Sequence, residues 1–402
     1  MTAAQRPTFN ARHLAVGLAG FCTFINLYSP QAILPLLSSE FGAGAAEIAN
    51  IMTASTLAVA ITAPFTGTVA DVLGRKRVIV TAMLILGIPT VMCALAPTLH
   101  ALVFWRFVQG LVMPPIFAVT IAYIGDEWSP REATAAAGVY TSGASIGGFS
   151  GRLVTGVLSD LIGWRYALVS IAVMTLAGAV AVMMLLPRER KFVRSEGLIA
   201  SGRQMLQHLR NGQLLATYAV GFGVLFSFVA LFTYINFRLA AAPYNMSPTW
   251  LGAIFVTYMV GSGLTPLAGW AVGRFGRRRF MMPVMFVWIA GVLLTLSDPL
   301  WLIVAGLTLC AGCGLICQAI STGYVTITAK AGRSSAVGLY VTCFYTGGSF
   351  GAAFGGIAWI FGGWPAVAGA IVVMLVIMTG VVFFAWAHRV PPEAPGTPVE
   401  PP

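Results

Sequence analysis

Residues 67–77 read GTVADVLGRKR and form a short charged stretch between two long apolar runs. A related stretch, GWAVGRFGRRR, occupies residues 269–279, 202 positions further along the chain. A proline precedes each copy at the same distance, Pro64 in the first and Pro266 in the second. Since this offset is close to half of the 402 residues, the sequence predicts a duplicated chain in which each charged stretch is a tight loop between two membrane spans.

The composition is typical of a protein embedded in a membrane. Hydrophobic residues make up 58% of the chain and charged residues 9%, whereas soluble domains carry about 25% charged residues. The mean hydropathy is +0.86. A helix needs about 20 apolar residues to cross a bilayer, and apolar runs of that length follow one another here. The sequence therefore predicts a polytopic membrane protein without a sizeable soluble domain.

The apolar runs predict an all-α membrane protein with twelve transmembrane helices in two pseudo-symmetric six-helix bundles. We expect the spans near residues 13–37, 47–70, 77–96, 99–124, 134–158, 165–187, 213–238, 248–272, 279–297, 300–327, 335–361 and 364–387. The expected division is an N-terminal bundle over residues 1–187, a cytoplasmic connector over 188–212, a C-terminal bundle over 213–389 and a disordered cytoplasmic tail over 390–402. Because the first apolar run continues past Leu37, we interpret it as a span and not as a secretory signal.

Positive charges predict the orientation. The net charge is +11, with 23 Lys and Arg residues, a balance that is also found in nucleic-acid-binding proteins. Nineteen of the 23 fall in alternate segments between the predicted spans, and basic residues concentrate in cytoplasmic loops. We therefore expect both termini in the cytoplasm and no nucleic-acid partner. The four exceptions are Arg106, Arg152, Arg165 and Arg238, of which the first two lie inside apolar runs.

A second repeat supports the duplication. The sequence GVY at residues 138–140 aligns with GLY at residues 338–340, an offset of 200, and glycines at 147, 148, 151, 156 and 163 keep glycine counterparts at that offset. Glycines three or four residues apart let two helix backbones approach closely in lipid. The repeat thus indicates tight helix packing; a hinge that bends during transport is the alternative.

The first charged loop resembles the signature loop of the major facilitator superfamily, and the second loop lies where that family repeats it. The matching residues are Gly67, Asp71, Gly74, Arg75, Lys76 and Arg77. The resemblance implies two six-helix bundles around a central cavity, which rock to open it to alternate sides of the membrane. In the second loop Gly273 stands where Asp71 stands in the first, so the two copies are electrostatically unequal.

Three further segments resemble proton-coupled members of that family, in particular its twelve-span drug:proton antiporter branch. They are residues 26–42, NLYSPQAILPLLSSEFG; residues 106–110, RFVQG, which match an Arg-x-x-Gln-Gly signature; and residues 140–164. Residues 143–148, GASIGG, lack the proline that this branch usually has there. Proton-linked export is what the resemblance implies.

The first loop is a candidate conformational latch, formed by Gly67, Asp71, Gly74, Arg75 and Arg77. A carboxylate at a helix end can accept backbone N–H bonds from the start of a neighbouring helix. The family resemblance implies that Asp71 holds the start of the eleventh span, near Ser334 and Ser335. The alternative is that the basic residues of this loop only orient the chain.

Two arginines within apolar runs are the leading candidates for a binding role, because a guanidinium in lipid is costly and turns toward a cavity or a partner. Arg106 shares a helix face with Gln109. Three roles for Arg106 are open: it binds an anionic group of the substrate, it tunes the pKa of a proton site, or it holds backbone carbonyl groups together as a structural clamp. Arg152 lies on a polar stripe of the fifth span, and its counterpart at the repeat offset is Ala352. For Arg152, a structural salt bridge is the alternative to a cavity role.

We expect none of the twelve acidic residues at the centre of a span. Two embedded arginines without an embedded carboxylate predict a positive cavity, which favours neutral or anionic cargo over organic cations. Proton coupling is then expected from Asp71, Asp126 or Glu47 near the membrane faces, or from protons carried on the substrate. The full set of candidate cavity residues is Asn26, Gln31, Arg106, Gln109, Arg152, Tyr234, Arg238 and Gln318.

The sequence contains no motif for a catalytic nucleophile, a metal site or a nucleotide phosphate, and we expect no cofactor. Its six cysteines lie in apolar runs and are interpreted as packing residues. We therefore predict a monomeric secondary transporter in a bacterial-type inner membrane, which carries out proton-linked efflux of small hydrophobic, neutral or anionic organic molecules. An importer or facilitator of organic anions is the alternative, and an integral membrane enzyme is a minor one.

Overall fold

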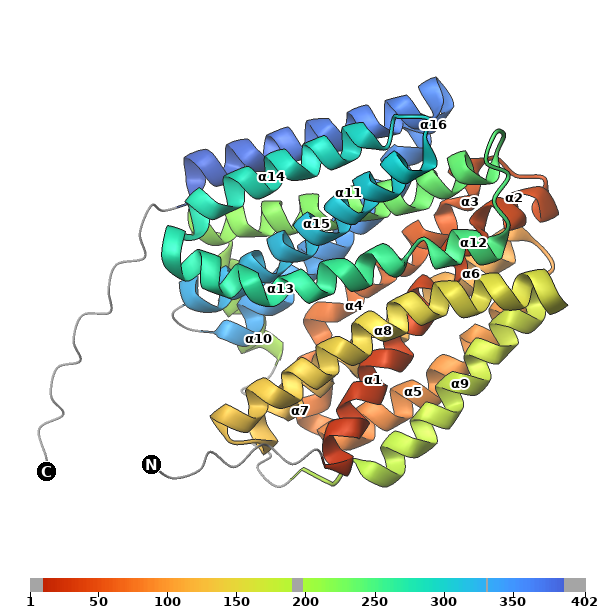
Figure 1. Cartoon of the computed structure of the whole chain (residues 1–402). Helices are drawn as coiled ribbons and strands as arrows, with labels where there is room; N and C mark the ends of the chain where they lie inside the picture. Colours follow the sequence, from red (N-terminus) through yellow and green to blue (C-terminus); the bar gives the residue numbers. More distant parts are fainter. Residues whose placement is uncertain (1–9, 190–197, 330–331, 387–402) are drawn as a thin grey trace, which may run out of the picture.

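The computed structural model describes residues 10–189, 198–329 and 332–386, which form helices joined by short turns (Figure 1). The N-terminal half supplies six crossings: α1 Ala11–Tyr28 continued by η1 Ser29–Ile33 and α2 Leu34–Phe41, α3 Ala45–Ile48 with α4 Asn50–Leu73, α5 Arg75–Ala94, α6 Leu99–Val112 with α7 Pro114–Glu127, α8 Pro130–Ile162, and α9 Trp164–Leu185. After α10 Leu198–His208, six more come from α11 Gly212–Ala240, α12 Pro248–Ala253 with α13 Val256–Phe275, α14 Arg277–Leu294, α15 Leu300–Thr328 and the two arms of α16 Arg333–Ala385. The predicted tail over residues 390–402 lies outside the described residues.

The long helix α16 contains two crossings, because its backbone leaves the helical conformation at Gly362 and Gly363. Gly363 has a φ of 59°, a left-handed value that residues with a side chain rarely adopt. Pro365 follows within the first turn of the second arm, where a missing N–H is tolerated. The break falls between the predicted spans 335–361 and 364–387.

Other crossings are interrupted helices. Seven helical stretches of the described chain are long and apolar enough to span a membrane; α3 with α4 and α6 with α7 each count as one stretch, and α16 is counted once. The predicted span 13–37 is divided by the 3-10 turn η1, in which Pro30 has no N–H to continue the α-helical ladder. The predicted span 248–272 is divided between α12 and α13. Both breaks lie beside the site described below.

Each half is built on one closely packed pair of helices, α1 with α8 and α11 with α16. A Cβ added at Gly147 would lie 2.3 Å from the carbonyl oxygen of Phe21, and one added at Gly347 would lie 2.0 Å from that of Phe222. No larger residue fits at either position without moving a backbone. The packing interpretation of the repeated glycines is therefore confirmed at this pair.

The two halves meet mainly through α4 with α16 and α8 with α12. The hydroxyls of Thr56 in α4 and Ser349 in α16 lie 2.9 Å apart, and a Cβ at Gly156 of α8 would lie 2.3 Å from the carbonyl oxygen of Pro248 in α12. In Figure 1 the halves are closest around α3, α12 and the end of α8, and they diverge toward α10. We call the end at which α8 ends and α12 begins the closed end. The loop end is the one at which α4 meets α5 and α13 meets α14.

Candidate functional site

Arg106 of α6 clamps the point at which α1 ends. It is 1% exposed, and its guanidinium donates to the carbonyl oxygens of Asn26 at 2.9 Å and Leu27 at 2.7 Å. Further donations go to the hydroxyl of Ser55 at 3.0 Å, to a carbonyl oxygen of α4 at 3.4 Å and to the side-chain oxygen of Gln109. Since arginine has five N–H donors, all of them are used within the protein. The structure thus favours the clamp over direct binding of substrate.

A buried network of amides and hydroxyls supports this clamp. The Gln109 amide donates to Oδ1 of Asn26 at 3.0 Å and to the Thr90 hydroxyl at 2.8 Å. Thr90 donates to the same Asn26 oxygen at 2.7 Å, and Asn26 donates to Thr175 of α9 at 2.7 Å. The network joins α1, α5, α6 and α9 where α1 gives way to η1. The predicted shared face of Arg106 and Gln109 is present, and protein groups occupy it.

Arg152 of α8 is equally buried but less completely bonded. It is 2% exposed, and its Nε and Nη2 both donate to one acceptor, Oε1 of Gln31 in η1, at 2.8 and 2.6 Å. Nη1 donates to the carbonyl oxygen of Gly148 at 2.9 Å. These three bonds leave two N–H donors of Arg152 for other acceptors. Within the described residues its contacts include no carboxylate, so the predicted alternative of a structural salt bridge is not seen.

Three aromatic rings surround the Arg152 guanidinium. Its central carbon lies 4.2 Å from the ring centres of Tyr28 and Phe255 and 5.0 Å from that of Tyr258. Ring faces attract a cation at such distances. Phe255 and Tyr258 belong to the C-terminal half, so this group of rings joins the two halves. The rings escape sequence reasoning, and the sole signal for any of them is that Tyr28 lies in the NLYSPQ motif.

Gln31 connects Arg152 to the C-terminal half. Its side-chain nitrogen donates to the Thr233 hydroxyl at 3.3 Å, and its backbone oxygen accepts from the Asn236 amide at 2.7 Å. Gln31 is 1% exposed, and the other two residues, both on α11, are fully buried. The chain of contacts therefore runs from α8 through η1 to α11, across the boundary between the halves.

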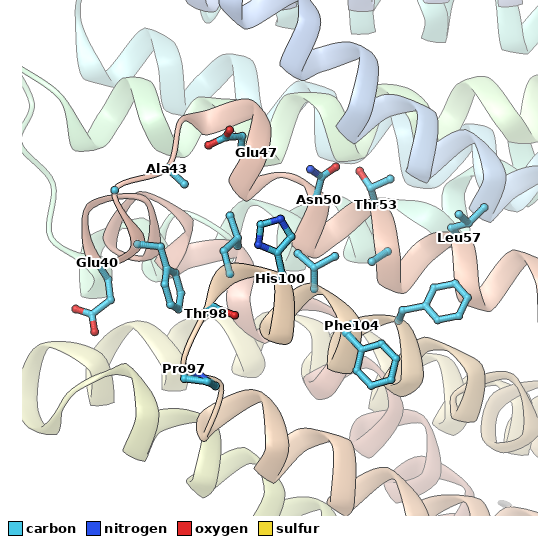
Figure 2. A pocket seen from close by; sticks show the side chains of 16 residues that line it. Glu40, Ala43, Glu47, Asn50, Thr53, Leu57, Pro97, Thr98, His100 and Phe104 are labelled. Carbon is cyan, nitrogen blue, oxygen red and sulfur yellow. The ribbon is translucent and has the colours of Figure 1, made fainter.

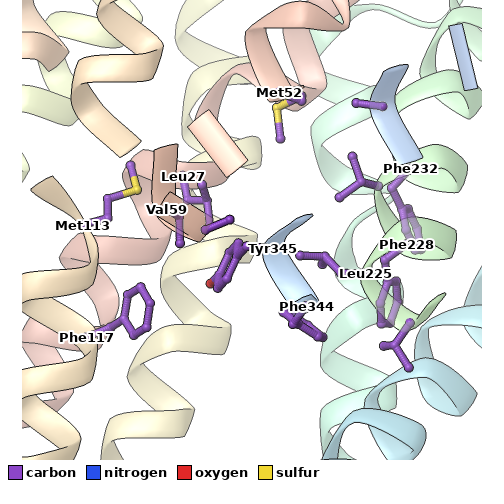
Figure 3. Close-up of a cluster of buried hydrophobic side chains, with 14 of the residues drawn as sticks. Leu27, Met52, Val59, Met113, Phe117, Leu225, Phe228, Phe232, Phe344 and Tyr345 are labelled. Atoms are coloured by element: carbon purple, nitrogen blue, oxygen red, sulfur yellow. The ribbon is translucent and has the colours of Figure 1, made fainter. Parts of the chain in front are cut away.

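Buried apolar side chains of both halves form a cluster (Figure 3). Those labelled in the figure are Leu27, Met52, Val59, Met113 and Phe117 from the N-terminal half, and Leu225, Phe228, Phe232, Phe344 and Tyr345 from the C-terminal half. The rings of Phe117 and Tyr345 are stacked across the boundary with centres 5.9 Å apart. Phe228 and Phe232 of this cluster pack against Tyr258, the ring that also lies against Arg152.

Three other predicted cavity residues lie away from Arg152. The Tyr234 hydroxyl donates to a carbonyl oxygen of the first arm of α16 at 2.6 Å. Arg238 donates to the carbonyl oxygen of Ser297 at 2.9 Å and lies 3.5 Å from Asp298, which fixes the α14–α15 turn. Gln318 is partly buried on α15. Helical spacing identifies the polar face of a span, but it does not tell which neighbouring helix that face contacts.

The first charged loop is organised by ion pairs within the N-terminal half. Arg75 lies 2.6 Å from Asp126 at the end of α7 and 3.7 Å from Asp71 in the last turn of α4. Gly74 has a φ of 90°, which lets α4 turn directly into α5. Arg77 is exposed. One arginine is thus shared by two carboxylates at the loop end.

The contact predicted between Asp71 and the start of the eleventh span is not among those of the described residues. At that helix start, Ser335 instead donates to Gln204 of α10 at 3.1 Å; the side chain of Ser334 is outside the described set. A Cβ added at Gly67 would meet no other atom within 4 Å. Because the halves diverge at the loop end, Asp71 is paired within its own half in this conformation.

A carboxylate at the closed end makes the kind of contact that was predicted for Asp71. Oδ2 of Asp160, near the end of α8, accepts from the Ser247 hydroxyl and from the Thr249 backbone N–H, both at 2.9 Å. It therefore caps the start of α12 in the other half. The sequence Ser-Pro-Thr at 247–249 is a recognisable helix start, but nothing local indicates that its acceptor comes from α8.

A separate cavity of about 1010 Å³ lies between the α2–α3 turn, α4 and α6 (Figure 2). Glu40 at its rim is paired with Arg165 at 2.9 Å, and this hydrogen bond holds the pKa of the Glu40 carboxyl below its usual value. Glu47 accepts a backbone N–H at 3.1 Å from the turn before α3. All lining residues fall within 40–107 and hence in one half. The cavity is therefore distinct from the boundary at which Arg152 lies.

Metal-ligating side chains are dispersed. In the described parts of the chain, no group of three or more His, Cys, Asp or Glu residues is placed to hold a metal ion. The six cysteines are free, and five of them are buried. Burial among helices agrees with a packing role.

Comparisons with known proteins agree with this architecture. The family model of the Major Facilitator Superfamily matches residues 16–239 and 239–402. The chain is 36% identical over 375 residues to the inner membrane transport protein YnfM of Escherichia coli (strain K12), covering 92% of this chain and 89% of that protein. It is 30% identical over 372 residues to the uncharacterized MFS-type transporter YybF of Bacillus subtilis (strain 168), covering 92% of both. A crystal structure of the nucleoside transporter NupG superposes with a TM-score of 0.78 at 16% identity, covering 93% of this chain and 100% of that one. The chain therefore belongs to the Major Facilitator Superfamily, and it is an integral membrane secondary transporter and not an enzyme.

Proposed function

We propose that this transporter exports small hydrophobic molecules, neutral or anionic, across a bacterial inner membrane in exchange for protons, and that it works as a monomer of the drug:proton antiporter type. The observation that carries the proposal is Arg152, a buried cation at the boundary of the halves without a carboxylate among its described contacts. A charged group inside a membrane marks a substrate or ion pathway. A positive one attracts anions and disfavours organic cations.

The surfaces beside Arg152 support an apolar cargo. Phe117 and Tyr345 stack across the boundary of the halves, and Phe228 packs against Tyr258, the ring beside Arg152. Burial of apolar area contributes about 25 cal/mol per Å², so a molecule with one or two rings gains several kcal/mol there. Apolar surface supplies affinity, and the single charge selects among molecules of similar shape.

The conformation is one in which an exporter takes up cargo from the cytoplasm. Contacts between the halves concentrate at the closed end, where Asp160 caps α12. The basic residues Arg75, Lys76 and Arg77 lie at the loop end, and basic loops face the cytoplasm. With that orientation both termini are cytoplasmic, and the halves diverge toward the compartment from which an exporter takes its cargo.

The ion-pair cluster at the loop end supports proton coupling. Arg75 is shared between Asp126 at 2.6 Å and Asp71 at 3.7 Å. When one carboxylate is protonated, Arg75 pairs with the other one. The cluster therefore has two arrangements, with Arg75 paired either with Asp71 or with Asp126. We assign the coupling proton to this pair of carboxylates. Glu47, the other candidate, is engaged in capping the turn before α3.

Purified protein in proteoliposomes tests the proposal. A pH gradient is imposed, and fluxes are compared for a permanent anion (naphthalene-2-sulfonate), its neutral analogue (naphthalene-2-sulfonamide) and a quaternary ammonium ion. We expect the gradient to drive the anionic and neutral probes, and an uncoupler to stop both. Flux that ignores the gradient and the uncoupler would instead indicate the facilitator of organic anions, and flux of the cation alone would contradict a positive site.

A further inference from the structure

Gln31 occupies the edge of Arg152 that oxyanions prefer. The Nε and Nη2 groups of an arginine form a fork that matches the two oxygens of a carboxylate. Here both groups donate to the single Oε1 of Gln31, at 2.8 and 2.6 Å. A neutral amide oxygen thus stands where a charged acceptor would bind more strongly, since hydrogen bonds between ionised partners are roughly twice as strong as neutral ones.

Among the described residues, no group in contact with Arg152 supplies the missing negative charge. Its described neighbours are the amide of Gln31, a backbone carbonyl of its own helix and three aromatic rings. An arginine remains charged in proteins, and a charge within the membrane normally pairs with an opposite one. The site therefore supplies hydrogen-bond donors for an anion, but its positive charge has no negative partner.

The rings around Arg152 indicate the rest of the ligand. Phe255 is buried, whereas Tyr28 and Tyr258 are partly exposed. The two tyrosines come from opposite halves, and both lie against the guanidinium at 4.2 and 5.0 Å. A flat ring attached to an oxyanion can stack on them while its charged group reaches the arginine.

We propose that Arg152 binds the carboxylate or sulfonate of a planar aromatic substrate, and that Gln31 is a resident substitute which this group displaces. The proposal rests on the export function above and specifies its substrate class. No covalent step is involved. The oxyanion takes over the Nε and Nη2 donors, and the Gln31 side chain turns away from Arg152.

Displacement of Gln31 also acts on the boundary between the halves. The same side chain donates to Thr233 of α11 at 3.3 Å. When the substrate anion takes the place of the Gln31 oxygen on Arg152, the Gln31 side chain is no longer held in position, and its hydrogen bond to Thr233 is weakened. A ligand shifts a conformational equilibrium only by binding one state better than the other. Anion binding therefore favours the state in which the closed end separates, which couples loading to opening.

Calorimetric titration of the purified protein tests the assignment with naphthalene-2-sulfonate and naphthalene-2-sulfonamide, which share shape and differ in charge. We expect the wild type to bind the sulfonate at least about tenfold more tightly than the sulfonamide, a ratio that corresponds to one charge-assisted hydrogen bond. Arg152→Gln abolishes this ratio. Gln31→Ala tightens the sulfonate several-fold, because no resident acceptor has to leave.

Two controls keep the result interpretable. Arg165→Gln removes an arginine of the same half that is paired with Glu40 at the surface, and Gln213→Ala removes a glutamine that bonds Tyr324 at the start of α11. Both retain the wild-type ratio. If Arg152→Gln does not fold, Arg152→Lys replaces it, since it keeps the charge without the fork and is expected to lose most of the ratio.

Equal binding of the two probes by the wild type, an unchanged ratio in Arg152→Gln or Arg152→Lys, or weaker sulfonate binding in Gln31→Ala would each overturn the proposal. Calorimetric titration measures binding without transport, so failure of this inference can be distinguished from failure of the proposed function. Proton-driven flux without selective sulfonate binding contradicts this inference alone. Selective binding without proton-dependent flux contradicts the coupling proposed above and leaves the binding site standing.

Discussion

Gln31 accepts two hydrogen bonds from Arg152 through one oxygen, at 2.8 and 2.6 Å, and passes the contact on to Thr233 in the opposite half. Arg106 shows the contrasting arrangement, since its five donors end on groups of its own half. The two buried arginines, in α6 and α8, therefore have different roles. Arg106 stabilises the point at which α1 gives way to η1. Arg152 is a buried positive charge without a negative partner among its described contacts.

Replacement of Gln31 by glutamate supplies that charge permanently. In Gln31→Glu the carboxylate fills the fork of Arg152, which we expect to stabilise the protein by about 1–2 kcal/mol and to reduce binding of naphthalene-2-sulfonate at least about tenfold. Thermal unfolding and calorimetric titration measure the two effects. Gln213→Glu is the matched control. Unaltered sulfonate binding in Gln31→Glu would show that ligand and residue 31 do not compete.

Removal of Arg106 should harm the fold more than the binding site. Arg106→Ala leaves the carbonyl oxygens of Asn26 and Leu27 and the Ser55 hydroxyl without their donor. Each buried acceptor left unsatisfied costs about 1–3 kcal/mol, so we expect a loss of about 3 kcal/mol or more and poor yield of folded protein. Size-exclusion profiles and thermal unfolding measure this. A variant of wild-type stability that has lost sulfonate binding would show instead that Arg106 contacts the substrate.

Cross-linking of α4 to α16 should arrest transport. The hydroxyls of Thr56 and Ser349 lie 2.9 Å apart, which brings cysteine sulfurs at these positions within reach of a bond of about 2 Å. In a Cys343→Ala background, which removes the one cysteine that is not fully buried, oxidised Thr56→Cys/Ser349→Cys should lose at least about 90% of its flux. Reduction should restore the flux, and each single variant should be insensitive to oxidant. Full flux in a completely cross-linked sample would mean that these helices do not separate during the cycle.

The pair of Glu40 and Arg165 should give stability a small acid dependence. The Arg165 hydrogen bond lowers the pKa of Glu40, so the pair stabilises the folded state above the ordinary glutamate pKa of about 4.3. That contribution is lost as the pH falls through the lowered value. At pH 7 Glu40→Gln should lower Tm by at most about 2 °C, because the pair is exposed, and the difference should disappear once the pH is below the lowered pKa. A gap that persists at acid pH would assign the effect to something other than this ion pair.

Much of the fold can be predicted from the sequence, because membrane spans require long apolar runs and because the two halves of the chain share a repeated pattern. The offset of 200 residues predicts the paired glycine contacts, and a single helix is enough to place Arg106 beside Gln109. Contacts between halves are different in kind. Phe255 and Tyr258 reach Arg152 because α12 and α13 cross α8, and no local pattern encodes that crossing.

The two carboxylates at the helix ends show a second limit. The loop signature identifies Asp71, but whether Asp71 meets the start of α16 depends on which end of the transporter is closed. In this conformation Asp160 caps a helix of the other half and Asp71 pairs with Arg75. The same sequence adopts every conformation of the transport cycle, whereas each of these contacts forms in only some of them. The sequence therefore does not predict which contact is present in a given conformation.

The flux of naphthalene-2-sulfonate in proteoliposomes under an imposed pH gradient, compared between the wild type and Arg152→Gln, tests the central claim most directly. The account predicts that the wild type moves the sulfonate until an uncoupler is added, and that Arg152→Gln loses this flux while it still moves the sulfonamide. Sulfonate flux of wild-type magnitude in Arg152→Gln would contradict it.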